Sequence, residues 1–161
     1  MYTAYLLTGS NLGERELYLE QASIYLTQRC GRIVQQSALY ETAPWGIQEQ
    51  PSFLNQAIAI KTLLTPEELM NSLLHIEELM GRIRTVKYGP RTIDLDILLY
   101  DQIIMNSQLL KLPHPSLPER RFALTALAEI APDLVHPILK KTVKTLLSAC
   151  TDNSNVQKKI N

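Results

Sequence analysis

The segment 53–61 constrains the fold most, because its side chains alternate as they do along a β-strand. Leu54 and Ile58 would point to one side of the extended chain, while Phe53 and Asn55 would point to the other together with two alanines. We therefore expect a sheet. From their β-branched, aromatic and aliphatic residues, further strands are predicted at 1–8, 32–41 and 93–100, the last turning back into 103–105.

A capping box predicts the clearest helix. Thr65 can cap it, Pro66 suits the first helical position and Glu68 completes the box, so a helix is expected from there to about Met80. Further helices are predicted from apolar spacing and helix-end signals at 14–28, 118–131 and 142–150.

Strands and helices alternate early in the chain and mix later. This order predicts an α+β domain, in which helices cover the faces of a mainly antiparallel sheet. The pattern alone leaves open whether the core is ferredoxin-like. We expect residues 1–161 to form one domain, with a frayed tail from about residue 151 because that segment has no apolar periodicity.

The composition narrows the class of protein. The chain has 161 residues, of which 45% are hydrophobic, which is ample for a core and excludes a disordered chain. Sixteen basic residues balance 16 acidic ones, which argues against a polybasic nucleic-acid binder. No apolar run approaches the roughly 18 residues that span a bilayer. We expect a cytoplasmic monomer that binds neither nucleic acid nor membrane, with Cys30 and Cys150 as thiols and one disulfide as the alternative.

Two carboxylates interrupt the apolar strand at 93–100. Asp94 and Asp96 should project from one face of the strand, while Leu95, Ile97 and Leu99 take the other. Neighbouring carboxylates repel each other unless a positive group compensates, and Mg²⁺ held by oxygens is the common solution. The alternative is a solvated strand face that carries acids.

A basic segment comes directly before these aspartates. Arg82, Arg84, Lys87 and Arg91 lie within ten residues, beside Gly89-Pro90 in a predicted loop. Arginine forks grip phosphate oxygens, so cations beside paired carboxylates favour a site for metal and polyphosphate. The alternative is that the arginines and aspartates only form salt bridges.

Three further polar positions are candidates for binding. His114 stands in a rigid Pro-His-Pro segment shortly before Arg120, which is compatible with a second phosphate contact, although a lone histidine is more often structural. Asn55 beside Phe53 suits recognition of a flat heterocycle, although an amide that satisfies edge-strand backbone is equally compatible. Glu77 should lie near the buried face of its helix, where it needs a cation or a polar ligand as a partner.

The segment Gly9-Ser10-Asn11-Leu12-Gly13 lies between a predicted strand and a predicted helix, as a phosphate-binding loop does. It lacks the lysine and the spacing of the P-loop motif. We interpret it as a turn with a packing role.

Several motifs occur in a fixed order along the chain. They are Tyr40-Glu41-Thr42-Ala43-Pro44, Phe53-Leu54-Asn55, Glu77, Gly81-Arg82-Ile83-Arg84, Gly89-Pro90-Arg91-Thr92-Ile93-Asp94-Leu95-Asp96-Ile97 and Leu112-Pro113-His114-Pro115. Together they resemble the 6-hydroxymethyl-7,8-dihydropterin pyrophosphokinase family of folate biosynthesis, over nearly the whole sequence. The resemblance implies an α/β/α sandwich with a ferredoxin-like core, and transfer of diphosphate from ATP to the hydroxymethyl oxygen of the pterin with release of AMP.

The resemblance also implies roles for individual residues. Asp94 and Asp96 would hold two Mg²⁺ ions, and Arg82 and Arg91 would be catalytic. The positions implied for ATP binding are Glu77, Arg84, Arg91, Ile97, His114 and Arg120. Those implied for the pterin are Thr42, Pro44, Phe53, Asn55, Asp94 and Phe122, with the two phenylalanines on either side of the ring.

A second hypothesis is a non-catalytic nucleotide- or RNA-binding module on a ferredoxin-like sheet. Such a module needs aromatic side chains on its central strands and a basic surface. With 6% aromatic residues and no net charge, the chain argues against it.

Overall fold

The computed structural model describes residues 1–42, 51–81 and 92–159. Its strands are β1 (Tyr2–Ser10), β2 (Arg32–Gln36), β3 (Tyr40–Thr42), β4 (Phe53–Thr62), β5 (Asp94–Tyr100), β6 (Met105–Asn106), β7 (Lys111–Leu112) and β8 (Val156–Lys158). Its helices are α1 (Arg15–Arg29), α2 (Pro66–Leu79), the 3₁₀ turn η1 (Leu117–Glu119), α3 (Arg121–Ile130) and α4 (Val143–Ala149).

The main sheet is antiparallel throughout, in the order β5-β1-β4-β3-β8, and β2 also pairs with β4. The first part of the chain runs strand, helix, two strands, helix, strand if β2 and β3 are taken as two parts of one strand. This connectivity and strand order are those of a ferredoxin-like core. The predicted strand at 32–41 is therefore present but divided into two pieces.

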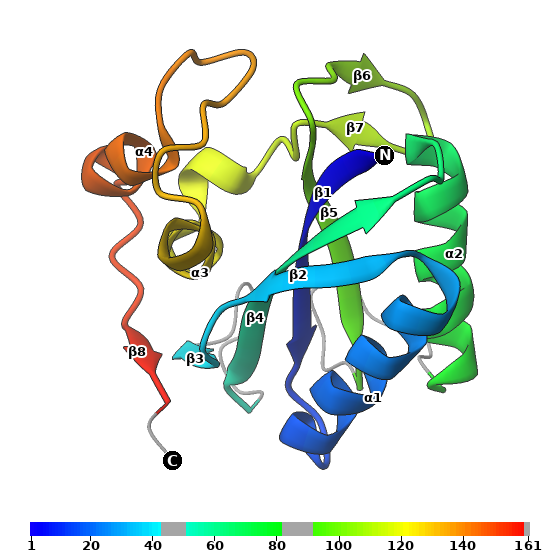
Figure 1. Cartoon of the computed structure of the whole chain (residues 1–161). Coiled ribbons are helices and arrows are strands. Elements are labelled where there is room, and N and C mark those ends of the chain that lie inside the picture. The colour runs from blue at the N-terminus through cyan, green and yellow to red at the C-terminus, as the bar shows by residue number, and fades with distance from the viewer. Residues whose placement is uncertain (43–50, 82–91, 160–161) are drawn as a thin grey trace.

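Helices cover both faces of the sheet, so the chain forms the predicted α/β/α sandwich. Figure 1 shows α1 and α2 on one side of the sheet and α3 and α4 on the other. One apolar core joins α1 and α2 to side chains such as Leu54 and Ile58, and a second joins α3 and α4 to Leu7 and Ala57. The alternation predicted for β4 is confirmed, because its neighbouring residues enter different cores.

The capping box of α2 is present as predicted. The Thr65 hydroxyl accepts from the Glu68 N–H at 3.2 Å, and the Glu68 carboxylate accepts from the Thr65 N–H at 2.9 Å. These two bonds satisfy donors that the first helical turn cannot pair internally. No helix among the described residues is long and apolar enough to cross a membrane. Cys30 and Cys150 are both free thiols, so the disulfide alternative is wrong.

Two predictions are wrong in detail, one about the face of a strand and one about the start of a helix. Leu99 does not lie on the face of β5 predicted for it. It packs in the core of α3 and α4 together with its neighbour Leu98. The pairing with β1 skips Leu98, since Tyr5 is opposite Leu99 and Leu6 is opposite Ile97. This bulge shifts the alternation by one residue. The helix predicted from residue 118 begins at Arg121, after η1.

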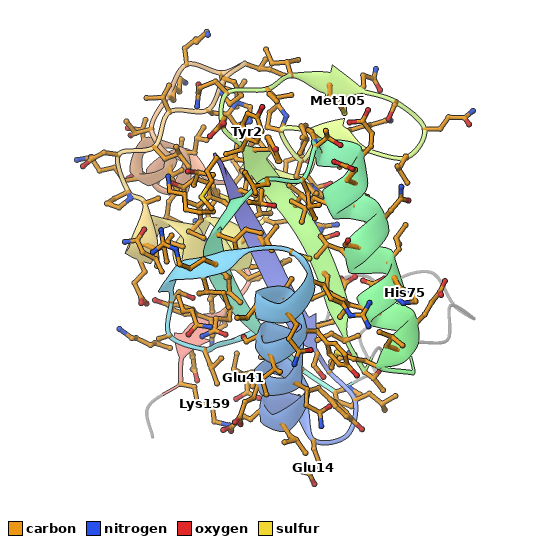
Figure 2. The ribbon with its side chains drawn as sticks, turned by 45° about the vertical axis from the view of Figure 1, so that its right-hand side comes forward. Tyr2, Glu14, Glu41, His75, Met105 and Lys159 are labelled. Atoms are coloured by element: carbon orange, nitrogen blue, oxygen red, sulfur yellow. The ribbon has the colours of Figure 1, made fainter. Side chains whose placement is uncertain are left out.

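The tail is ordered where fraying was predicted. Val156–Lys158 pairs with β3, placing Val156 opposite Thr42, and Figure 1 shows this strand at the edge of the sheet. An ion pair joins Lys159 to Glu16, and in Figure 2 Lys159 lies near Glu41, at the end of the sheet opposite Tyr2. The pairing is non-local, so apolar periodicity within the tail does not reveal it.

Candidate active site

Strand pairing aligns three candidate residues across the sheet. Strand β1 lies between β5 and β4. Its Gly9 is opposite Asn55 of β4 on one side and opposite Asp94 of β5 on the other. Directly paired residues of antiparallel strands share a face, so Asn55 and Asp94 project to the same side, above Gly9. Leu7 packs against α3 and is paired with Asp96, which puts both carboxylates on the α3 face.

Aromatic and hydroxyl groups lie on the same face of the sheet as Asn55. Phe53 lies two residues before it on the same face of β4, and Thr42 of β3 is paired with Phe53. Phe122 lies near the start of α3 and is buried over this face of the sheet. The Thr42 hydroxyl is buried without a hydrogen-bond partner in the described part of the chain, which suits a group that bonds a ligand.

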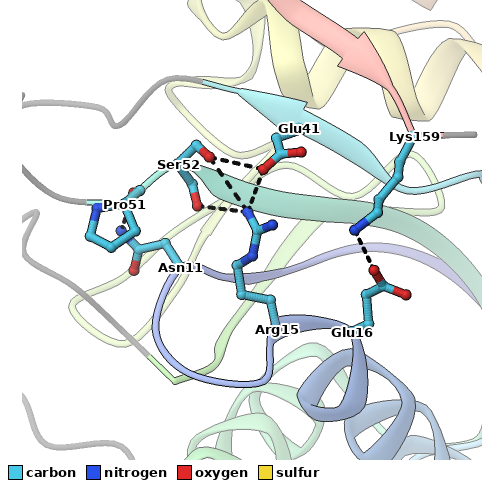
Figure 3. Close-up of polar contacts among 7 residues, drawn as sticks. All are labelled: Asn11, Arg15, Glu16, Glu41, Pro51, Ser52 and Lys159. Carbon is cyan, nitrogen blue, oxygen red and sulfur yellow. Dashed lines mark hydrogen bonds and ion pairs between the residues drawn. The ribbon is translucent and has the colours of Figure 1, made fainter.

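An ion pair holds the beginning of β4 in place. The Arg15 guanidinium donates to the Glu41 carboxylate at 2.7 Å and to the Ser52 carbonyl at 3.0 Å, and the Ser52 hydroxyl donates to the same carboxylate at 2.9 Å (Figure 3). The bonds from Arg15 and Ser52 lower the pKa of Glu41. Asn11 adds a bond to the Pro51 carbonyl at 3.0 Å. The strand that carries Phe53 and Asn55 is thereby tied to both α1 and β3.

Glu77 is buried under the two aspartates. It is 2% exposed, and its Oε2 accepts a hydrogen bond from the Leu95 N–H at 2.8 Å. Leu95 separates Asp94 from Asp96. Backbone N–H of β5 therefore supplies one polar partner for the charge, and the predicted cation or ligand stays a prediction. This bond fixes the part of β5 that carries the carboxylates.

A hollow of about 270 Å³ opens beside β5. Three predicted residues line it, since Asp96, Ile97 and His114 all contribute to its wall. The remaining lining residues are Met70, Ser107, Gln108, Leu109, Leu110, Lys111 and Pro115. Sequence reasoning missed the segment 107–111, which follows β6 and ends on the first residue of β7 and whose only sequence signal is the turn that precedes it. A hollow of this kind, mixed polar and apolar, can hold part of a small ligand.

His114 is held as a neutral base. Its Nδ1 accepts from the Ser116 N–H at 3.1 Å, and the backbone N–H of His114 donates to the Leu98 carbonyl at 2.9 Å. Burial, aided by the charge of Arg120 and opposed by Asp94, lowers the pKa of His114 from 6.5 to about 4. Because Nδ1 accepts, the neutral ring carries its proton on Nε2 and can donate a hydrogen bond there.

Arg120 is near one residue of each predicted binding area, Phe122 of the pterin area and His114 of the ATP area. Its guanidinium carbon is 5.9 Å from the centre of the Phe122 ring, and its charge acts on His114. The other two histidines lie elsewhere. His75 is exposed on α2 (Figure 2), and His136 is buried with its Nδ1 accepting from the Ile138 and Leu139 N–H groups. The predicted residues Pro44, Arg82, Arg84 and Arg91 lie outside the described residues.

Comparison with known proteins decides the family. The model of the family described as 7,8-dihydro-6-hydroxymethylpterin-pyrophosphokinase (HPPK) matches residues 5–132. The chain belongs to the HPPK family. The resemblance noted from the motifs is confirmed, and the alternative of a non-catalytic nucleotide- or RNA-binding module is not supported.

Curated relatives that are named as pyrophosphokinases of the pterin match almost the whole chain. The 2-amino-4-hydroxy-6-hydroxymethyldihydropteridine pyrophosphokinase of Bacillus subtilis is 43% identical over 155 residues, covering 96% of this chain and 88% of its own. The protein of that name from Methylorubrum extorquens is 45% identical over 159 residues, covering 98% and 99%. These matches extend over both predicted binding areas.

Solved HPPK structures share the fold. The HPPK-DHPS of Plasmodium falciparum crystallised with pteroate has a TM-score of 0.74 at 18% identity, covering 92% of this chain. This chain spans 42% of that longer protein. The likeness supports the sandwich architecture described above.

Proposed function

We propose that this chain transfers the diphosphate of ATP to the hydroxymethyl oxygen of 6-hydroxymethyl-7,8-dihydropterin and releases AMP, as a step of folate biosynthesis. One observation carries the proposal: the two carboxylates of β5 belong to two different features of the structure. Asp94 shares a row with Asn55, while Asp96 lines the hollow that contains His114. Two adjacent strand spacings, about 10 Å, separate Asn55 from Asp94, and Gly9 between them adds no side chain to the row.

The donor set of β5 fits magnesium bound together with a nucleotide. Mg²⁺ is commonly held by one or two carboxylates and by substrate phosphates, with water completing the octahedron. Among the described residues no group of three acidic, histidine or cysteine side chains forms a cage, and Asp94 and Asp96 are half-buried. We propose that these two residues hold two Mg²⁺ ions. The ions would neutralise phosphate charge and stabilise the attacking and leaving oxygens.

The pterin is proposed to lie over the row of Asn55, Gly9 and Asp94. The Asn55 amide would donate and accept along the edge of the ring, and Phe53 and Phe122 would stack on its two faces. The Thr42 hydroxyl, buried without a bond in the described part, would gain one from the ligand. Pro44, which follows Thr42 closely in sequence, is proposed to complete this pocket.

The nucleotide is proposed to occupy the hollow beside β5. Ile97 supplies apolar contact there, and the neutral His114 would donate from Nε2 to a phosphate oxygen. Arg120 adds a permanent positive charge, and Glu77 keeps β5 in position from below. Among the arginines of the basic segment, Arg84 is proposed to close over the nucleotide.

Arg82 and Arg91 are proposed to stabilise charge that develops on the transferred group. Guanidinium groups suit this role because they remain charged and grip two oxygens at once. On this assignment Arg91→Ala slows transfer more than it weakens ATP binding. Single-turnover rates and ATP affinity, measured separately, test it, and equal losses in both would reduce Arg91 to a binding contact.

Removal of Asp96 tests the metal site. Asp96→Ala should abolish AMP formation from ATP, Mg²⁺ and the pterin while leaving the circular dichroism spectrum unchanged. Asp133→Ala is a matched control, because Asp133 is an exposed acid paired only at the surface with Lys144. Turnover by Asp96→Ala at the rate of the control would remove Asp96 from the proposed site.

We further propose that the chain acts as a single-domain monomer in the cytoplasm. Sedimentation equilibrium at assay concentrations checks the oligomeric state, and a stable dimer would contradict it.

A further inference from the structure

Gly9 is glycine for a reason other than its backbone. Its φ angle lies outside the left-handed region, in contrast to Gly13 and Gly81 with φ of +73° and +81°. Gly9 is a regular part of β1, paired on both sides, so alanine could adopt the same conformation there. Any need for glycine must therefore come from the space around its Cα.

The amide of Asn55 takes that space. A Cβ atom built on Gly9 would lie 2.5 Å from Asn55 Oδ1 and 3.5 Å from its Cγ. Two heavy atoms that are not covalently bonded do not approach to 2.5 Å unless they share a hydrogen bond, and a methyl carbon cannot donate one effectively. The Asn55 side chain thus lies across β1, above the missing side chain and toward the row position of Asp94.

The clash would move a side chain without breaking the sheet. At Gly31 the same construction meets the Lys61 backbone carbonyl at 2.1 Å, where only a shift of the strand could make room. At Gly9 the nearest atom is the end of a side chain, while the nearest backbone atom, the Leu54 carbonyl oxygen, is at an ordinary 3.7 Å. An added methyl group would turn the Asn55 amide away and leave the backbone pairing in place.

Packing directs this amide. Asn55 is 4% exposed, yet within the described ranges none of the hydrogen bonds involves its side chain. A buried amide costs free energy unless a partner satisfies it. An amide that lies above the Cα of Gly9, with bonding groups left available, suits a group that bonds a ligand.

We propose that Gly9 is a positioning residue for pterin recognition, whose missing side chain directs the Asn55 amide across β1 toward the ring. The inference rests on the proposed function and adds a residue outside the pocket predicted from the sequence. It differs from a turn or packing role because it acts through one named side chain.

The test is a double-mutant cycle on the full chain, with Gly9→Ala, Asn55→Ala and the two combined. Isothermal titration gives the affinity for 6-hydroxymethyl-7,8-dihydropterin and, separately, for ATP with Mg²⁺. Gly9→Ala should weaken pterin binding by at least about tenfold, the effect of losing hydrogen bonds worth about 1.4 kcal/mol. It should change ATP affinity by less than about twofold, because the hollow is lined by other residues.

The double variant decides the mechanism. If Gly9 acts through Asn55, adding Gly9→Ala to Asn55→Ala causes no further loss of pterin affinity, whereas independent roles give additive losses. Thermal stability is measured in parallel, and any loss in Gly9→Ala should be recovered when the amide is removed. Ser10→Ala is the control for a change in β1 that leaves the Asn55 amide in place. The Ser10 hydroxyl is buried without a bond in the described part, and as the next residue of β1 Ser10 points to the other face.

Three results would overturn the inference. They are pterin binding by Gly9→Ala equal to that of the unmodified chain, additive losses in the double variant, and an unstable double variant that shows the clash to lie elsewhere. Failure of the unmodified chain to bind the pterin would contradict the proposed function itself, and the inference with it.

Discussion

Acid should weaken the fold through His114, and the effect can be calculated from its surroundings. In the unfolded chain this imidazole takes up a proton near its ordinary pKa of 6.5, whereas the folded chain holds the pKa at about 4. Between these values the unfolded state binds more protons, so the free energy of unfolding falls as the pH falls. The contribution is complete above pH 6.5 and lost below about pH 4.

The size of the effect follows from the shift. A difference from 6.5 to about 4 corresponds to about 3 kcal/mol at 1.36 kcal/mol for each pKa unit. Most of it, about 2 kcal/mol, should be lost between pH 7 and pH 4.5. Other groups with lowered pKa values, such as the Glu41 and Asp152 carboxyls, also lose stabilisation in acid.

A difference measurement isolates His114 from these carboxyls. Urea unfolding followed by circular dichroism gives the free energy of unfolding for the unmodified chain and for His114→Gln, whose amide does not titrate. The advantage of the unmodified chain should shrink by about 2 kcal/mol from pH 7 to pH 4.5. A difference that stays constant with pH, or an imidazole that titrates near 6.5 by NMR, would refute the buried neutral histidine.

Other contacts give smaller, separate predictions. Glu77→Ala removes the acceptor of the Leu95 N–H and should lower the free energy of unfolding by about 1 to 3 kcal/mol; an unchanged urea midpoint would show that this bond does not hold β5. Asp152→Ala removes a carboxylate that accepts from the Arg121 N–H at 3.0 Å. It should lower the free energy of unfolding by about 1 to 2 kcal/mol and speed hydrogen exchange in β8. Unaltered exchange would show that this bond does not hold the tail against α3. Thr65→Ala removes the cap of α2 and should cost about 1 kcal/mol by thermal unfolding, unless the melting temperature is unaffected, in which case the cap contributes nothing.

Local signals made much of the fold predictable. The alternation in β4 and the capping box of α2 each depend on residues within a few positions, and both are present in the structure. The failures have non-local causes. The bulge at Leu98 arises where β5 pairs with β1, and β8 is ordered by pairing with β3 and by bonds from Arg121 to the carbonyls of Cys150 and Asp152.

The candidate site was predictable as residues but not as an arrangement. Alternation puts Asp94 and Asp96 on one face of a strand, but only the register through Gly9 shows that Asn55 shares that face. The hollow beside β5 depends on the segment 107–111, which no local pattern marks as a wall. The balance of 16 acidic and 16 basic residues likewise excludes a basic protein without showing where opposite charges meet.

Nucleotide product analysis tests the central claim most directly. The protein is mixed with ATP, Mg²⁺ and 6-hydroxymethyl-7,8-dihydropterin, and the nucleotides are separated as the reaction proceeds. The account predicts AMP, formed in equal amount to a diphosphorylated pterin and absent when the pterin is omitted. Release of ADP, or no nucleotide product at all, would contradict it.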